Sequence, residues 1–178
     1  MSKTRLLIVL VVFTVYFTGC NNSSYKKENK RNIPEKISEN QLIRMNKYLV
    51  RQEKNEINRY IKSNNLIMKE TASGLRYHIF KHGTGVSAQK GRIAVLRYKL
   101  SLLNGKVIDS SEKSGLKIFQ IGHGGVVSGL EEGIILLKVG DKAKFILPSH
   151  LAYGLTGDGI NVPPHKAIVY DVEFVQLK

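Results

Sequence analysis

The residue in this chain whose type and setting are best suited to chemistry is Tyr153, in the segment LAYGLTGDGINVPPH at positions 151–165. Glycine and proline at this density predict an ordered loop with several special backbone angles rather than a helix or a central strand. The same loop carries the apolar residues Leu151, Ile160 and Val162. One phenol among apolar groups is suited to the wall of an apolar pocket with a single polar group.

A second glycine-rich segment, GHGGVVSG at 122–129, precedes a predicted helix and could indicate a phosphate-binding loop. Four observations exclude that interpretation. No Gly-Lys-Ser/Thr ends the run, and Val127 stands where a dinucleotide fingerprint needs its third glycine. The surroundings do not predict a parallel βαβ unit. Glu131 and Glu132 occupy the place where an anion would have to bind.

The acids after this segment are typical of a helix N-terminus. Ser128 and Glu131 have the spacing of a capping box. We therefore expect a short helix from Leu130 to Lys138, ended by Gly140.

Metal binding is not indicated by the histidines, because they show no paired ligand spacing. They lie at positions 78, 82, 123, 150 and 165. We predict no metal site and no cofactor.

Strands dominate the C-terminal part of the chain. Apolar and β-branched runs predict strands at 75–80, 93–102, 107–110, 116–121, 143–148 and 168–177. Asn104-Gly105 is a strong hairpin-turn signal, and Asp109 lies near the end of the strand that follows it. Few helices and tight turns predict an α+β domain built around an antiparallel sheet.

Seven short motifs occur here in the order and at the spacings of one family. They are GKVIDSS (105–111), IFQIG (118–122), VVSGLEEGI (126–134), VGDKAKFILP (139–148), AYG (152–154), VPPH (162–165) and IVYDVEFVQL (168–177). Over about 85 residues, without a large insertion, the chain resembles the FKBP-type peptidyl-prolyl cis-trans isomerases. The resemblance implies a twisted antiparallel sheet wrapped around one short helix, over residues 71–178.

The resemblance also implies roles for particular residues. Tyr153 matches the phenol that donates a hydrogen bond to a substrate carbonyl, and Asp109 matches a carboxylate at the pocket rim. The matching substrate-binding positions are Tyr98, Val126, Val127, Leu130, Ile160, Val162 and Tyr170, with the Val127 N–H as a further donor. For Tyr98, Val126, Val127 and Tyr170 taken singly, plain core packing is the alternative.

Three positions depart from the family's pattern. Leu130 stands where a tryptophan usually forms the pocket floor, and Ile108 and Lys117 stand where aromatic residues are usual. A smaller floor removes apolar contact area, which would cost about 1–3 kcal/mol of substrate binding.

The N-terminus has the residue pattern of an export signal. Lys3 and Arg5 precede a 12-residue apolar run, 6–17, which is too short to span a bilayer. The run ends in Phe-Thr-Gly-Cys and resembles a bacterial lipoprotein cleavage box, although leucine is usual where Phe17 stands. We expect a signal peptide at 1–19 and a lipidated Cys20, the only cysteine. The alternatives are an ordinary signal peptide and an uncleaved anchor.

The residues after Cys20 bear on localisation and organisation. Asn21, rather than aspartate, predicts outer-membrane sorting, with the protein facing the periplasm. Residues 20–37 are rich in Asn, Ser and Lys and predict a flexible tether.

A helix over 38–65 is expected next, with Ser38 and Gln41 in a capping-box pattern and two asparagines, 64 and 65, at its end. Its thin apolar stripe comprises Leu42, Met45, Leu49, Ile57, Tyr60 and Ile61, and the polar stretch 51–56 interrupts it. The helix could pack on its own domain or form a dimer, and the sequence leaves both open.

The net charge is +14, spread along the chain with its highest density in the N-terminal arm. A basic arm could lie on an anionic membrane or bind an acidic partner, and a solvated surface is the alternative. No nucleic-acid-binding motif occurs, so we predict no nucleic-acid partner.

Two functions are compatible with these features. The first is a periplasmic prolyl isomerase that assists the folding of proline-containing envelope proteins. The second is a non-catalytic FKBP-like chaperone or structural module of an envelope complex. Residues 56–79, with the lipoprotein start, further resemble the FKBP-like lipoproteins associated with gliding motility, which suggests clients in a motility or secretion machinery.

Overall fold

The structure is a computed structural model that describes residues 38–178. The predicted signal peptide, Cys20 and the tether lie outside the described residues. In chain order the elements are α2 (Glu39–Ser63), β1 (Lys69–Glu70), β2 (Arg76–Lys81), β3 (Ile93–Leu102), β4 (Val107–Ser110), α3 (Ser111–Ser114), β5 (Lys117–Gln120), α4 (Ser128–Ile135), β6 (Lys142–Leu147), the 3-10 turn η1 (Ser149–Leu151) and β7 (Ile168–Leu177).

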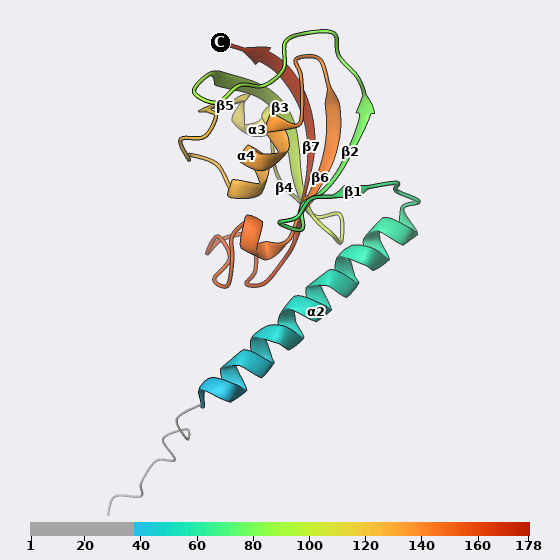
Figure 1. Ribbon diagram of the computed structural model, residues 1–178, viewed down its shortest axis with the longest axis vertical. Helices are drawn as coiled ribbons and strands as arrows, with labels where there is room; N and C mark the ends of the chain where they lie inside the picture. Colours follow the sequence, from blue (N-terminus) through green and yellow to red (C-terminus); the bar gives the residue numbers. More distant parts are fainter. Residues whose placement is uncertain (1–37) are drawn as a thin grey trace, which may run out of the picture. The chain divides into compact units, whose positions relative to one another are not determined.

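One antiparallel sheet organises these elements, with the strand order β1-β2-β6-β7-β3-β4 and β5 paired to β3 (Figure 1). The longest pairing joins β3 and β7 from Ala94↔Leu177 to Leu102↔Ile168. Residues alternate along β3, so Tyr98 is buried while its neighbour Arg97 is exposed and pairs with Glu173 on β7 at 2.8 Å. The antiparallel α+β fold expected from the sequence is confirmed.

The main core lies between the sheet and α4, which Figure 1 shows against one face of the sheet. Two glycines allow this close approach. A Cβ built on Gly129 would lie 2.6 Å from Leu147, and one on Gly133 would lie 2.8 Å from the Phe145 ring. Glycine weakens a helix interior, but here it lets the backbone pack directly on the sheet. The two glycines therefore lower the intrinsic stability of α4 but allow it to pack closely on the sheet.

The start of α4 differs from the prediction. The helix spans Ser128–Ile135 rather than Leu130–Lys138, and its N-cap residue, Val127, makes no side-chain cap bond. The predicted capping box is wrong. The Ser128 hydroxyl donates to the Leu151 carbonyl at 3.4 Å. The Glu131 carboxylate accepts hydrogen bonds from the loop before the helix instead.

The long helix α2 has 25 residues and ends where the asparagines predict. The Asn64 side chain donates to the Tyr60 carbonyl at 2.9 Å, and Asn65 adopts a φ of 51°. The C-terminal half of α2 packs in cis on the sheet. There Ile57 is 3% exposed and belongs to a second cluster with Ile146, Ala167 and Val169.

The N-terminal half of α2 is different. It extends away from the sheet (Figure 1), and Leu42 and Met45 from the predicted stripe are about half exposed. No helix within residues 38–178 is long and apolar enough to cross a membrane.

One contact ties α2 to the far end of the chain. Glu53 is 7% exposed, and its carboxylate accepts hydrogen bonds from the Ser149 N–H at 2.7 Å and the Ser149 hydroxyl at 3.0 Å. Burying a carboxylate is tolerated where its oxygens are hydrogen-bonded. Glu53 thereby fixes the start of η1, four residues before Tyr153.

Residues Glu39–Lys178 form one compact unit. This unit contains the whole sheet and both clusters of buried apolar side chains. Because a unit with its own core can fold alone, we expect residues 39–178 to fold as an isolated fragment. The narrower boundary expected from the sequence, residues 71–178, stays a prediction.

Candidate functional site

A hollow of about 330 Å³ opens beside the N-terminus of α4. It collects residues from four parts of the chain that the sheet and η1 bring together. Its lining comprises Lys117, Gly125, Val126, Val127, Tyr153 and Tyr170. The two valines and the two rings give it apolar walls, and the phenol hydroxyls and the ammonium give it a few polar groups. Apolar walls with a few convergent polar groups are the usual composition of a ligand site.

A fixed carboxylate lies next to this hollow. Asp109, near the end of β4, accepts hydrogen bonds from the Tyr98 hydroxyl, from the Ser114 hydroxyl at 2.6 Å and from the Ser110 N–H at 2.8 Å. Partial burial opposes its charge, but the bonds from Ser114 and Tyr98 outweigh that effect and hold the pKa of Asp109 below its ordinary value. Asp109 is therefore an oriented anion at neutral pH.

The phenol groups of Tyr98 and Tyr170, near Asp109, stay protonated. Burial, and then the neighbouring Asp109, raise the pKa of Tyr98 to about 12. Burial also raises the pKa of Tyr170, and its ring centroid lies 6.1 Å from that of Tyr98 at an angle of 49°. Both phenols are thus neutral hydrogen-bond donors throughout the physiological range.

Lys117 adds a cation that contacts this aromatic pair. Its Nζ lies 4.6 Å from the centre of the Tyr98 ring, which is the geometry of a cation–π contact. The same ammonium helps to lower the pKa of Asp109. Lys117 therefore lines the site, although the sequence marked it only as a departure from the family's pattern.

The loop that carries Tyr153 is ordered, as predicted. Gly154, Gly157 and Gly159 all have positive φ values, and a Cβ on Gly157 would lie 2.1 Å from the Val162 carbonyl oxygen. The Asp158 carboxylate closes the turn.

One oxygen of Asp158 accepts three backbone N–H groups, those of Ile160, Asn161 and Val162, at 2.7–2.9 Å. Burial and then the charge of Asp158 raise the pKa of Tyr153, so its hydroxyl also stays protonated.

The structure brings together six of the nine predicted catalytic and substrate-binding residues. Val126, Val127, Tyr153 and Tyr170 line the hollow, and Tyr98 and Asp109 contact them or each other. The other three do not line it.

Leu130 and Val162 are buried in the main core, and Ile160 is 87% exposed at the loop surface. Contact between these three residues and a bound peptide stays a prediction.

Sequence reasoning did not name Ser114 or Gly125 as site residues. Ser114 lies in α3, the single helical turn after Asp109, and its hydroxyl orients that carboxylate. The only signal was the run of small polar residues after Asp109, which is also typical of an ordinary turn. Gly125 contributes backbone alone, with a φ of 91°, so no side-chain type identified it.

Backbone N–H groups of the second glycine-rich segment, residues 122–129, are hydrogen-bonded to the nearby Glu131 carboxylate. The Gly122 and Gly124 N–H groups each donate to the Glu131 carboxylate at 2.9 Å. These are the donors that a phosphate would need, so the structure supports the exclusion of a phosphate loop. Among residues 38–178 no group of three or more His, Cys, Asp or Glu side chains could hold a metal ion.

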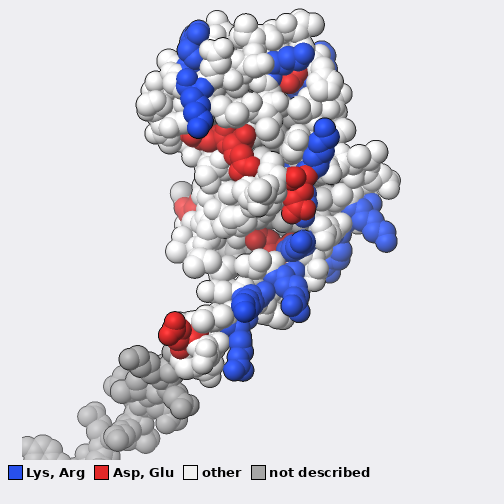
Figure 2. Space-filling view, in the orientation of Figure 1, with Lys and Arg blue, Asp and Glu red and all other residues white. Residues whose placement is uncertain are grey.

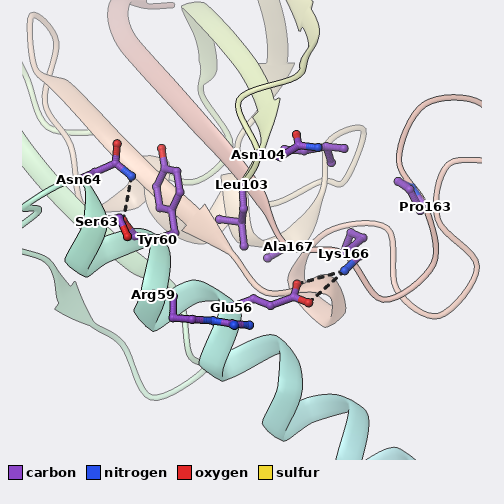
Figure 3. Close-up of a pocket in the computed structure, with 11 residues that line it drawn as sticks. Glu56, Arg59, Tyr60, Ser63, Asn64, Leu103, Asn104, Pro163, Lys166 and Ala167 are labelled. Atoms are coloured by element: carbon purple, nitrogen blue, oxygen red, sulfur yellow. Dashed lines mark hydrogen bonds and ion pairs between the residues drawn. The ribbon is translucent and has the colours of Figure 1, made fainter.

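A larger hollow, of about 470 Å³, lies between α2 and the β3–β4 turn (Figure 3). Tyr60 and Leu103 form part of its wall, and Glu56 and Lys166 pair across it at 3.1 Å. Its carboxylate is paired with its ammonium, so this hollow has no carboxylate that is oriented by hydroxyl and N–H donors as Asp109 is. Size alone therefore does not make it the functional site.

The comparisons with known proteins agree with this geometry. Residues 85–175 match the FKBP-type peptidyl-prolyl cis-trans isomerase family. A relative described as a probable FKBP-type peptidyl-prolyl cis-trans isomerase FkpA, from Neisseria meningitidis, is 40% identical over 111 residues, which cover 62% of this chain and 40% of the relative. FK506-binding protein 1 of Dictyostelium discoideum is 34% identical over 106 residues, covering 59% of this chain and 99% of the relative.

Solved structures give the same result. The crystal structure of AtFKBP13 superposes with a TM-score of 0.61 at 31% identity, covering 63% of this chain and 99% of that one. FkpA from Escherichia coli superposes with a TM-score of 0.64 at 25% identity, covering 100% of this chain and 74% of that one. The chain spans less than half the length of the first bacterial relatives, 40% and 45%. By its sequence match, its fold and its site, the chain belongs to the FKBP-type peptidyl-prolyl cis-trans isomerase family.

Proposed function

We propose that this chain catalyses the cis–trans isomerisation of X-Pro bonds in proline-containing polypeptides. One observation carries the proposal. Neutral phenols, apolar walls and an oriented carboxylate converge on one hollow, with Tyr153, Val126, Val127 and Tyr170 in its lining and Asp109 beside it.

The chemistry needs no nucleophile and no metal. An X-Pro bond rotates slowly because resonance gives it partial double-bond character, with a barrier of about 18–20 kcal/mol. The twisted transition state has lost this resonance, and its carbonyl is less dipolar. An apolar hollow disfavours the planar, more polar ground state more than the twisted form, so it lowers the barrier.

Each site residue then has a role. Val126, Val127 and Tyr170 receive the proline ring, and the Tyr153 hydroxyl donates to a substrate carbonyl. Asp109 holds the Tyr98 hydroxyl in place at the rim. Positioned groups of this kind act by favouring one amide geometry rather than by forming bonds.

The test is an isomerisation assay on the full chain with an apolar-Pro peptide. We expect cis–trans exchange well above the uncatalysed rate. A folded protein that shows no acceleration would favour the second candidate, a non-catalytic FKBP-like chaperone or structural module. The positions that favour this alternative are Lys117, Leu130 and Ile108, because none supplies the aromatic surface usual in the family.

Replacing Tyr153 by phenylalanine removes one hydroxyl and leaves the ring. A hydrogen bond between neutral groups contributes about 0.5–1.5 kcal/mol, so kcat/KM is expected to fall about 2–10-fold with the fold intact. Tyr48→Phe removes a hydroxyl from an exposed ring on α2 and serves as the matched control. An equal change of kcat/KM in the two variants would show that the Tyr153 hydroxyl has no role in catalysis.

We further propose that the protein is a lipoprotein of the outer membrane that faces the periplasm and assists the folding of envelope proteins. The charged start, the apolar run 6–17 and Thr-Gly-Cys support this proposal. The resemblance of residues 56–79 to gliding-motility lipoproteins supports clients in a motility or secretion machinery.

The anchoring proposal is tested at Cys20. Cys20→Ser removes the sulfur that would take the lipid, so processing of the precursor and labelling with a fatty-acid analogue should both be lost. Precursor size is read by immunoblotting of cell fractions. Normal processing of the variant, with the same membrane fractionation as the wild type, would contradict lipidation.

A further inference from the structure

The basic residues of α2 gather on one side of the helix. Arg44, Lys47, Arg51 and Lys54 follow each other at intervals of three and four residues, which places them on one face. Arg59 and Lys62 continue this face in the last turns. All six side chains are exposed, and Figure 2 shows Lys and Arg side chains following α2. We call these six residues the basic face.

Except for Arg59, which also lines the hollow between α2 and the β3–β4 turn, the basic face is directed away from the FKBP domain. Glu53 and Ile57, the two buried residues of α2, lie on the opposite side of the helix. Two of the three acidic residues of α2 interact with the FKBP domain. Glu53 accepts a hydrogen bond from Ser149, and Glu56 forms an ion pair with Lys166. Within residues 38–178, no ion pair involves any residue of the basic face. Six cations therefore remain for an external partner.

The shape of this surface favours an extended anionic partner. From Arg44 to Lys62 the basic face runs about 27 Å along a single helix, at 1.5 Å per residue. A shallow hollow of about 410 Å³ lies among Gln52, Asn55, Asn58, Arg59 and Lys62. Amide and cationic groups around such a hollow can bind phosphate oxygens. Tyr48, which is exposed, adds an aromatic ring of the kind found at membrane interfaces.

We propose that the basic face of α2 binds the surface of an anionic phospholipid bilayer. The sequence before α2 supports this partner, because Cys20 lies 19 residues before the start of the helix and directly follows the apolar run and Thr-Gly. A lipid on Cys20 would hold α2 beside the bilayer, where each Lys or Arg near an anionic surface adds about 1 kcal/mol of binding. A second copy of this chain does not fit, because two basic faces would repel each other. Nucleic acid is the competing polyanion, and the experiment includes it.

The proposal is tested on residues 39–178, which form one compact unit and lack the apolar run. Binding is measured by co-sedimentation with vesicles of phosphatidylcholine alone or with about 30% phosphatidylglycerol. A variant with Arg44, Lys47, Arg51 and Lys54 all changed to Gln removes four charges from the basic face. The matched control changes four exposed lysines elsewhere, Lys81, Lys90, Lys113 and Lys178, to Gln. Circular dichroism verifies the fold of both variants.

We expect tight binding only to the phosphatidylglycerol vesicles, and release as the salt concentration rises towards about 1 M, where the Debye length is about 3 Å. The α2 variant should bind at least about 30-fold more weakly, while the control should change less than about threefold. Equal binding to both vesicle types, or equal loss in both variants, would overturn the proposal. Retention by a DNA duplex without vesicle binding would overturn it in favour of nucleic acid. None of these readouts depends on isomerase activity, so the two proposals fail separately.

Discussion

Replacing Asp109 by leucine is expected to lower kcat/KM for an apolar-Pro peptide by about 10–100-fold, the factor that corresponds to hydrogen bonds to a charged group worth about 1.5–3 kcal/mol. Asp109 accepts three hydrogen bonds, and leucine accepts none. The buried Tyr98 hydroxyl would lose its acceptor, and the rings that line the hollow would lose their fixed position.

Two further variants separate charge from position. Asp109→Asn keeps an oxygen acceptor for Tyr98, so its activity should lie between those of the wild type and the leucine variant. Asp171→Leu removes a half-buried carboxylate that pairs with Lys144 on neighbouring strands, and it controls for the loss of a β-strand aspartate. An Asp171 variant as impaired as Asp109→Leu would mean that the effect is general destabilisation.

The lowered pKa of Asp109 also determines at which pH values its carboxylate stabilises the fold and supports activity. A carboxyl group whose pKa is lower in the folded state stabilises that state at every pH above its ordinary value, 3.8. The contribution disappears only as the pH falls through the lowered pKa. Titration of Asp109 should therefore leave kcat/KM constant between about pH 5 and pH 8.

The second large effect concerns α2. A fragment of residues 66–178 should fold cooperatively, because the main core lies between Leu75 and Phe174. It should nevertheless be about 3–5 kcal/mol less stable than residues 39–178, since it loses the burial of Ile57 and the Glu53 carboxylate that binds Ser149. Urea unfolding measures the difference.

A fragment that begins at residue 51 provides the control. It lacks the exposed first half of α2 but keeps Glu53 and Ile57, so its stability should be close to that of residues 39–178. An unfolded 66–178 product would show that the helix is part of the domain and would refute the boundary at residue 71. If the fragment 66–178 is as stable as residues 39–178, the contacts of Glu53 and Ile57 do not contribute to the free energy of unfolding.

The sequence predicted the strands well, because their signal is local. The predicted runs 93–102, 107–110 and 168–177 coincide with β3, β4 and β7. Apolar alternation and the Asn104-Gly105 turn suffice to define them. The candidate site residues came from the resemblance of short motifs to the FKBP family, and the structure brings six of the nine together.

The errors arose where a side chain binds a partner outside its own helix. Glu131 has the spacing of a capping-box acid, yet its carboxylate binds the loop at Gly122 and Gly124. Glu53 lies in the polar stretch that seemed to interrupt the apolar stripe of α2, but it is buried because Ser149, 96 residues away, donates to it. Periodicity treats a glutamate as a surface residue and cannot see such a partner.

The position of the last strand has a consequence for how the protein is made. In the order β1-β2-β6-β7-β3-β4, the C-terminal strand β7 lies between the first and second halves of the sheet and pairs with both β6 and β3. A chain from which β7 has not yet emerged therefore holds two sheet fragments with no strand to join them. Assembly of the sheet must wait for β7, and because the contacts that β7 makes with β3 are far apart in sequence, that step is inherently slow.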